Sequence, residues 1–221
     1  MGEPVQPGTL LAALKAVAAA LKADEVPFAL AGGFAVYARG GHPSLHDVDF
    51  VVPVESIPAA RTAFEKRDWE ITQPPEDWLV KVWVEGHCVD IIHRLSGLDV
   101  DRELLARTDE MAVESIRMPV LAANDLLLSK LMALQEHHCD LEPLLALMRS
   151  LREQIDLDTL SRACAGHPFA EAALFLGQRL GILSSGGEGD IDLTGVPSVS
   201  PAAQAAAASA DGSATPGEER A

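Results

Sequence analysis

Three aspartates in the first half of the chain stand in patterns that suit metal-ion chemistry. Asp47 and Asp49 flank Val48 at the start of the apolar run Phe50-Val51-Val52. Because side chains two positions apart in a β-strand share one face, the two carboxylates are expected to point the same way. Neighbouring carboxylates repel each other and lose hydration unless a cation lies between them, and hard oxygen ligands favour Mg²⁺ or Mn²⁺.

Asp90 is the third candidate ligand. It lies in the apolar segment 88–92, where a charged side chain needs a partner. The same metal ions would supply that partner. An ion pair with Lys81 across a hairpin is the alternative.

A pair of glycines stands upstream of these carboxylates. Gly32 and Gly33 end the apolar run 27–31 and open a short helix, with thirteen residues between Gly33 and Asp47. Glycines let backbone N–H groups approach a phosphate closely, and a helix N-terminus favours an anion. A phosphate cradle beside metal-binding carboxylates predicts a nucleoside triphosphate site with two divalent ions. An ordinary turn between strand and helix is the alternative for the glycines.

The elements that must position these residues form a small mixed β-sheet. Apolar periodicity and turn residues predict an N-terminal helix capped by Thr9, strands at 27–31 and 48–52, a helix at 57–66, and a hairpin of strands 79–84 and 88–92. The fold class is therefore α/β (α+β).

The second half is predicted to be mostly helical. After an extended segment at 116–121, either Asn124 or Asp125 is expected to cap a long helix through 134, and further helices are expected at 141–151, 157–164 and 169–180. Asp99 and Asp101 repeat the Asp-x-Asp spacing but begin a helical stretch, which favours a helix cap over a metal site.

The order of these motifs resembles the nucleotidyltransferase superfold related to DNA polymerase β. The likeness rests on Leu30-Ala31-Gly32-Gly33, Asp47-Val48-Asp49-Phe50 and Val89-Asp90-Ile91. In the helical half, the segments 124–130 and 137–141 are similar to small bacterial nucleotidyltransferases, including AbiE-like toxins and antibiotic-modifying enzymes. The resemblance covers about residues 25–150 and implies that Lys130 contacts the triphosphate.

Two departures from that family pattern motivate a second hypothesis. Relatives carry Arg and Thr or Ser shortly before the first aspartate, whereas residues 42–46 here read His-Pro-Ser-Leu-His and hold no Arg. His137 and His138 replace a basic pair. The alternative to an enzyme is a non-catalytic module of the same fold that binds nucleotide or a partner protein, for example in a toxin–antitoxin system.

Under the favoured hypothesis the chain is a metal-dependent transferase. It moves a nucleoside monophosphate from a triphosphate such as ATP to an acceptor hydroxyl and releases pyrophosphate. The resemblance implies roles for six residues: Asp47, Asp49 and Asp90 in metal binding and catalysis, and Gly32, Gly33 and Lys130 in nucleotide binding.

The predicted organisation has three parts. Residues 1–98 are the catalytic core, residues 99–183 a helical bundle that completes the site, and residues 184–221 an acidic tail rich in Ala, Ser, Gly and Pro. The tail is predicted to be disordered because it holds few large apolar residues.

Composition narrows the choice of partners. The 221 residues carry a net charge of −16 and no cluster of Lys and Arg, which disfavours binding to long nucleic acid. A small molecule such as an aminoglycoside, a protein hydroxyl and the end of a transfer RNA remain open as acceptors, and an antitoxin or a second copy of the chain as partners. Three cysteines without paired spacing, no signal sequence and no membrane-length apolar run predict a cytoplasmic protein.

Two further groups have open roles. The histidines and cysteines at positions 137, 138, 139, 164 and 167 are expected to pack or face solvent, with a soft-metal site as the alternative. Trp69, Trp78 and Trp83 are expected to pack on the sheet, with stacking on a nucleobase as the alternative.

Overall fold

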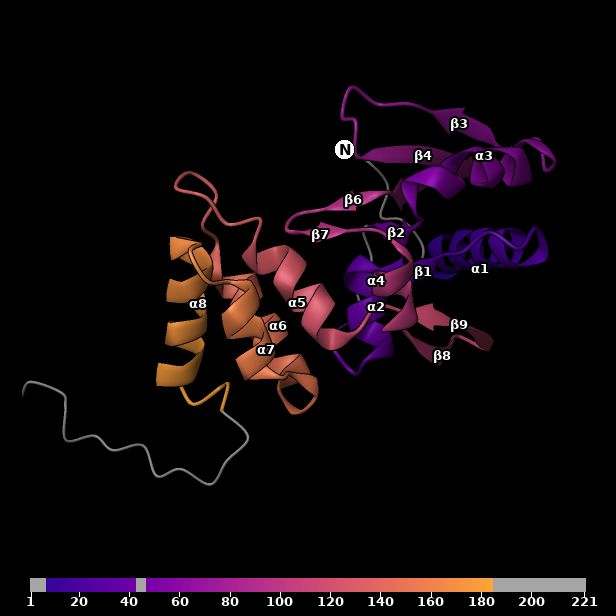
Figure 1. The fold of residues 1–221 in the computed structure, drawn as a ribbon. Coiled ribbons are helices and arrows are strands. Elements are labelled where there is room, and N and C mark those ends of the chain that lie inside the picture. The colour runs from indigo at the N-terminus through magenta and orange to yellow at the C-terminus, as the bar shows by residue number, and fades with distance from the viewer. Residues whose placement is uncertain (1–6, 43–46, 185–221) are drawn as a thin grey trace, which may run out of the picture. The chain divides into compact units, whose positions relative to one another are not determined.

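A computed structural model describes residues 7–42 and 47–184 (Figure 1). Within them, one seven-stranded mixed sheet has the order β3-β4-β5-β2-β1-β9-β8. Its strands are β1 (Ala29–Ala31), β2 (Val48–Val51), β3 (Glu70–Thr72), β4 (Leu79–Val84), β5 (His87–Ile92), β8 (Asp109–Val113) and β9 (Ile116–Val120). A second, two-stranded sheet pairs β6 (Arg94–Leu95) with β7 (Leu98–Asp99).

The strand register brings four predicted positions into one row. β1 and β2 are antiparallel with Ala31 opposite Asp49, and β2 and β5 are parallel with Asp49 beside Asp90. In the β4–β5 hairpin, Lys81 lies opposite Asp90. Paired residues in neighbouring strands share a face, so the row places the two aspartates side by side with a lysine next to them.

Eight α-helices complete the described chain. Four accompany the sheet: α1 (Pro7–Ala23), α2 (Gly32–Ala38), α3 (Ile57–Glu65) and α4 (Arg102–Ala106). Four more, α5 (Ala123–Leu131), α6 (Leu141–Leu151), α7 (Leu157–Ala163) and α8 (Pro168–Arg179), gather beside it (Figure 1). Short 3₁₀ turns lie at Val54–Ser56 and Arg152–Gln154.

Two apolar cores match these two groups. In the first, Leu14 and Leu21 of α1 are fully buried with Phe50 and Ile91 of the sheet, and Phe28 meets Phe50 edge to face at 5.6 Å between ring centroids. The second core lies among α5–α8. Burying one large apolar side chain contributes about 1.5–3 kcal/mol, so these cores hold the strand ends in place.

Arg39 connects the end of α2 to the segment that leads from the sheet into α5. Its side chain is 6% exposed and donates hydrogen bonds to the carbonyl oxygens of Leu121 (2.5 Å) and Val120 (3.2 Å) and to Asp109 (2.7 Å). α2 also packs against α5. The glycine turn and the helix that carries Lys130 are therefore fixed relative to each other.

The structure confirms the predicted α/β (α+β) class with a small mixed sheet. The sheet continues through β8 and β9, beyond residue 98, and the proposed domain divisions stay a prediction. The predicted disordered tail lies, from residue 185 on, outside the described residues. In the described ranges, none of the helices has the length and apolar character needed to cross a bilayer.

Several predicted boundaries are wrong. α1 begins at Pro7, so Thr9 lies inside the helix and is not its cap. The N-cap of α5 is Ala122, and neither Asn124 nor Asp125 caps it, because both side chains have other partners. The amide of Asn124 bonds the backbone of Asp156, at 3.1 Å from Nδ2 to O and 2.9 Å from N to Oδ1.

Of two further predictions about helix ends, one is confirmed and one is wrong. Asp101 caps α4, as predicted, by accepting a hydrogen bond from the N–H of Leu104 at 2.8 Å. α5 ends at Leu131 rather than continuing to Leu134, although Leu134 is buried. The apolar periodicity therefore continues into a turn that is no longer helical.

Candidate active site

The turn from β1 to α2 requires glycine at position 32. Gly32 has φ +57, in the left-handed region that other residues adopt at a cost. A Cβ atom there would lie 1.8 Å from Oδ2 and 2.8 Å from Cγ of Asp49. The carboxylate of Asp49 therefore lies directly against the Gly32 backbone, which explains the glycine by contact as well as by conformation.

Asp49 has the most perturbed carboxyl group of the predicted site. Burial, followed by the negative charges of Asp90 and Asp47, raises its pKa from 3.8 to about 6, and the positive charges of Lys130 and Lys81 oppose this. A carboxylate in such surroundings is stabilised by any cation that enters beside it.

Asp90 has a cation partner within the protein. Lys81 Nζ lies 2.7 Å from Oδ1 and 3.0 Å from Oδ2 of Asp90. Burial lowers the pKa of Lys81, but the hydrogen bond and the charge of Asp90 outweigh it, so that this pKa is raised. The pairing that the sequence offered as the alternative for Asp90 is thus present, and its role as a metal ligand stays a prediction.

A neutral thiol lies beside this ion pair. Burial and then the charge of Asp90 raise the pKa of Cys88 to about 11. Its Sγ lies 3.6 Å from Asp90 Oδ1. Cys88 is therefore a weak donor to the carboxylate and not a nucleophile at neutral pH.

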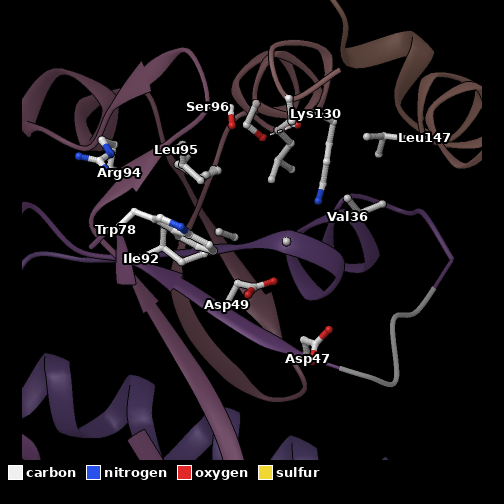
Figure 2. A pocket seen from close by; sticks show the side chains of 16 residues that line it. Val36, Asp47, Asp49, Trp78, Ile92, Arg94, Leu95, Ser96, Lys130 and Leu147 are labelled. Carbon is white, nitrogen blue, oxygen red and sulfur yellow. Dashed lines mark hydrogen bonds between the residues drawn. The ribbon is translucent and has the colours of Figure 1, made fainter. Parts of the chain in front are cut away.

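A cavity of about 470 Å³ opens beside the aspartates (Figure 2). Asp47, Asp49, Gly32 and Lys130 all line it, together with Ala31, Val36, Trp78, Ile92, Arg94, Leu95, Ser96, Leu121, Leu126, Ser129, Ala133 and Leu147. Among the residues that the structure describes, Gly33 and Asp90 do not line this cavity. The structure therefore brings four of the six predicted site residues to one cavity.

Lys130 reaches the cavity from α5. Figure 2 shows its side chain extending from the helix toward the side of the cavity where Asp47 and Asp49 lie. The first turn of α5 is anchored by Asp125, which is 6% exposed and bonds Arg107 through both oxygens at 3.0 and 3.2 Å. This ion pair between the buried Asp125 and the more exposed Arg107 fixes the start of the helix that carries Lys130.

Sequence reasoning missed the wall of the cavity opposite Lys130. Trp78 precedes β4, while Arg94, Leu95 and Ser96 follow β5. The sequence favours sheet packing for Trp78, with stacking on a nucleobase as the alternative, yet Trp78 is 37% exposed and lines the cavity. The place of these residues in the sequence could have indicated this. Residues that directly precede or follow two paired strands lie at one edge of the sheet, which here is the edge that carries the aspartates.

The candidate soft-metal residues lie in different environments. His137, His138 and Cys139 border a second hollow of about 520 Å³ that shares Lys130 with the first, whereas Cys164 is buried in the helical core. In residues 7–42 and 47–184, no three His, Cys, Asp or Glu side chains are already arranged around a metal position.

The donor set at the cavity nevertheless fits a hard divalent cation. Mg²⁺ is commonly held by one or two protein carboxylates and completes its shell with water and phosphate oxygens. Asp47 and Asp49 supply two such carboxylates at the cavity, and the pKa of Asp49 is raised by its burial and then by the neighbouring negative charges.

Comparison with known proteins identifies the class. Residues 5–185 match the model of a family described as "Uncharacterised nucleotidyltransferase", and the chain belongs to this family. The predicted nucleotidyltransferase fold is thereby confirmed, and the family supports nucleotidyl transfer as the general activity. None of the curated proteins matches the chain.

Solved structures of low sequence identity are also similar to this chain. The aminoglycoside enzyme ANT(2")-Ia in complex with adenylyl-2"-tobramycin is 12% identical over 78% of this chain and 98% of its own, with a TM-score of 0.48. The lincosamide antibiotic adenylyltransferase LnuA, lincomycin-bound, is 14% identical over 69% and 100%, with a TM-score of 0.47. A nucleotidyltransferase-like protein from Paracoccidioides brasiliensis is 15% identical over 78% and 95%, also with a TM-score of 0.47.

Proposed function

We propose that the chain transfers a nucleoside monophosphate from a nucleoside triphosphate, such as ATP, to an acceptor hydroxyl and releases pyrophosphate. The observation that carries this proposal is Asp49. Its carboxylate lies against the Gly32 backbone, lines the cavity with Asp47 and Lys130, and has a pKa raised to about 6. Membership of a nucleotidyltransferase family supports the same reaction class.

Asp47 and Asp49 would hold the divalent ions, Mg²⁺ or Mn²⁺, of which we expect two when nucleotide is bound. Bound there, such ions activate the acceptor hydroxyl and neutralise the leaving pyrophosphate. Asp90 stands next to Asp49 in the sheet, at the position for a third carboxylate. To bind a metal ion, Asp90 would have to give up its contact with Lys81.

The other site residues would bind and orient the triphosphate. Gly32 and Gly33 would offer backbone N–H groups to phosphate oxygens, and Lys130 would contribute a positive charge from α5. The reaction then depends on alignment of the two substrates and on charge stabilisation, because the protein forms no covalent bond to either one.

Replacement of Asp49 tests this function. Asp49→Asn removes the charge and retains the size of the side chain, so we expect loss of Mg²⁺-dependent nucleotide binding and pyrophosphate release. Asp99→Asn, at an exposed aspartate of β7, is the matched control. A cell extract with labelled triphosphate supplies candidate acceptors, and mass spectrometry identifies the product. Undiminished pyrophosphate release by Asp49→Asn would contradict the proposal.

The Lys81–Asp90 ion pair favours a second candidate function. With Asp90 held by a lysine, the fold would bind nucleotide or a partner protein, such as an antitoxin or a second copy of the chain, without turnover. Calorimetric titration with each nucleoside triphosphate and Mg²⁺, followed by the pyrophosphate assay, separates the two functions. Binding without product for every acceptor supports the module, whereas product formation supports the enzyme.

A further inference from the structure

The cavity has a second wall that the proposed nucleotide contacts do not use. Its residues are Trp78, Ile92, Arg94 and Leu95. In the strand order, β4 and β5, next to Trp78 and Ile92, lie on one side of β2, and β1, which leads into Gly32, lies on the other. Figure 2 shows the same division around Asp49.

Trp78 is a fixed, open aromatic surface in this wall. Its carbonyl oxygen accepts a hydrogen bond from the N–H of His93 at 3.0 Å, and the next residue, Leu79, accepts one from the Gln73 amide at 3.1 Å. These bonds hold the backbone at the start of β4 while the side chain stays 37% exposed. A large exposed ring at a cavity is suited to stack against a flat ligand.

Arg94 gives this wall a positive charge. Its protein partner is Asp77, and the two side chains are 55% and 79% exposed. Such exposed pairs contribute little stability, so a carboxylate or similar anion in the cavity can compete for the guanidinium group.

The acidic groups of the described cavity lining are Asp47 and Asp49, both assigned above to divalent ions. Residues 43–46, between α2 and β2, add no Asp or Glu to the sequence there. A polycationic acceptor needs carboxylates to pair with its ammonium groups, but this wall carries an arginine and an aromatic ring. The wall therefore suits an anionic acceptor better than a polycationic one.

The direction of the reaction assigns this wall to the acceptor. In phosphoryl and nucleotidyl transfer, the attacking and leaving oxygens lie roughly in line through phosphorus. Pyrophosphate leaving toward Gly32 and Lys130 requires the acceptor to approach from the opposite side of Asp49. That side carries Trp78 and Arg94.

We infer, building on the proposed nucleotidyl transfer, that the acceptor is a hydroxylated aromatic compound with a negative charge. Its ring stacks on Trp78 and its anionic group meets Arg94. The acceptor oxygen forms a bond to the α-phosphorus, the bond from that phosphorus to the bridging oxygen breaks, and pyrophosphate keeps the electron pair. The hydroxyl proton passes to solvent.

The test measures binding of three hydroxyl probes to the full chain. The probes are 4-hydroxyphenylacetate, the neutral compound 4-(2-hydroxyethyl)phenol and the polycation tobramycin, each titrated in the presence of Mg²⁺ and a non-hydrolysable ATP analogue. We expect 4-hydroxyphenylacetate to bind most tightly. Trp78→Ala should weaken both aromatic probes by about 5- to 150-fold, the range that alanine substitution gives where a nucleobase stacks on an aromatic side chain.

A second tryptophan near Trp78 in sequence offers a matched control variant. Trp83 of β4 is 39% exposed, close to the value for Trp78, but does not line the cavity, so Trp83→Ala should leave all three affinities unchanged. Arg94→Gln should weaken 4-hydroxyphenylacetate at least about 5-fold, as expected for loss of a charge-assisted contact, and spare the neutral probe.

Three results would overturn the inference. They are tighter binding of tobramycin than of the aromatic probes, no measurable aromatic binding, and an effect of Trp78→Ala on the ATP analogue instead of on the probes. The last result would assign the ring to the nucleobase. A wild-type chain that binds the analogue but no aromatic probe refutes this inference alone, whereas a chain that binds no nucleotide refutes the proposed function.

Discussion

Asp49 should destabilise the metal-free protein at neutral pH, and Asp49→Asn should reverse this. The rise in its pKa from 3.8 to about 6 corresponds to about 3 kcal/mol between the two protonation states. Below pH 3.8 the carboxyl is protonated in both states and there is no penalty. As the pH rises toward 6, the unfolded chain ionises first, so stability falls, and above 6 the full penalty of about 3 kcal/mol remains.

Urea unfolding in the presence of a chelator measures this difference. At about pH 7.5 the Asp49→Asn variant should unfold with up to about 3 kcal/mol more free energy than wild type, and at about pH 4 with much less. Asp99→Asn serves as the control because its side chain is exposed. Equal stability of Asp49→Asn and wild type at both pH values would refute the reasoning, since burial then costs the carboxylate nothing.

Three other substitutions test the structure around the site. Gly32→Ala should lower the free energy of unfolding by at least about 1 kcal/mol more than Gly181→Ala, because both have φ near +60 but only at Gly32 would the new Cβ overlap a side chain; urea melts that give equal losses would contradict this. Arg107→Met should cost about 2–3 kcal/mol by leaving the buried Asp125 unpaired, and adding Asp125→Leu should recover most of it; an uncoupled double-mutant cycle would refute the pairing. Lys81→Met should make thermal stability more dependent on Mg²⁺ than in wild type, and an unchanged dependence would exclude its carboxylate partner as a metal ligand.

Much of the fold could be predicted because local patterns and tertiary packing agree. The β4–β5 hairpin follows from strict alternation around a Glu-Gly turn, and Glu85 and Gly86 both have the positive φ that such a turn needs. Helix α6 spans Leu141–Leu151 as predicted, since its apolar stripe is regular and Asp140 caps it.

The missed strands carry weak local signals. β3 has three residues with no buried member, and β8 begins with two exposed acidic residues. Both are edge strands, which are stabilised by backbone pairing with one neighbour rather than by their own apolar content. In each case the partner is the next strand along the chain, β4 for β3 and β9 for β8. What β3 and the start of β8 lack is the run of buried residues by which a strand is predicted from sequence.

The candidate site shows the same limit at Asp90. The sequence offered a metal ion or Lys81 as its partner. A metal ion shared with Asp49 needs Asp90 on the same face as Asp49, and the ion pair needs Asp90 on the same face as Lys81. The parallel pairing of β2 with β5 and the antiparallel pairing of β4 with β5 put all three side chains in one row. In that row, Lys81 offsets the repulsion between the two carboxylates, and a divalent ion would offset more of it with twice the charge. Which cation Asp90 takes is therefore decided by the difference in free energy between lysine and metal contact, which Mg²⁺ titration of Lys81→Met measures directly.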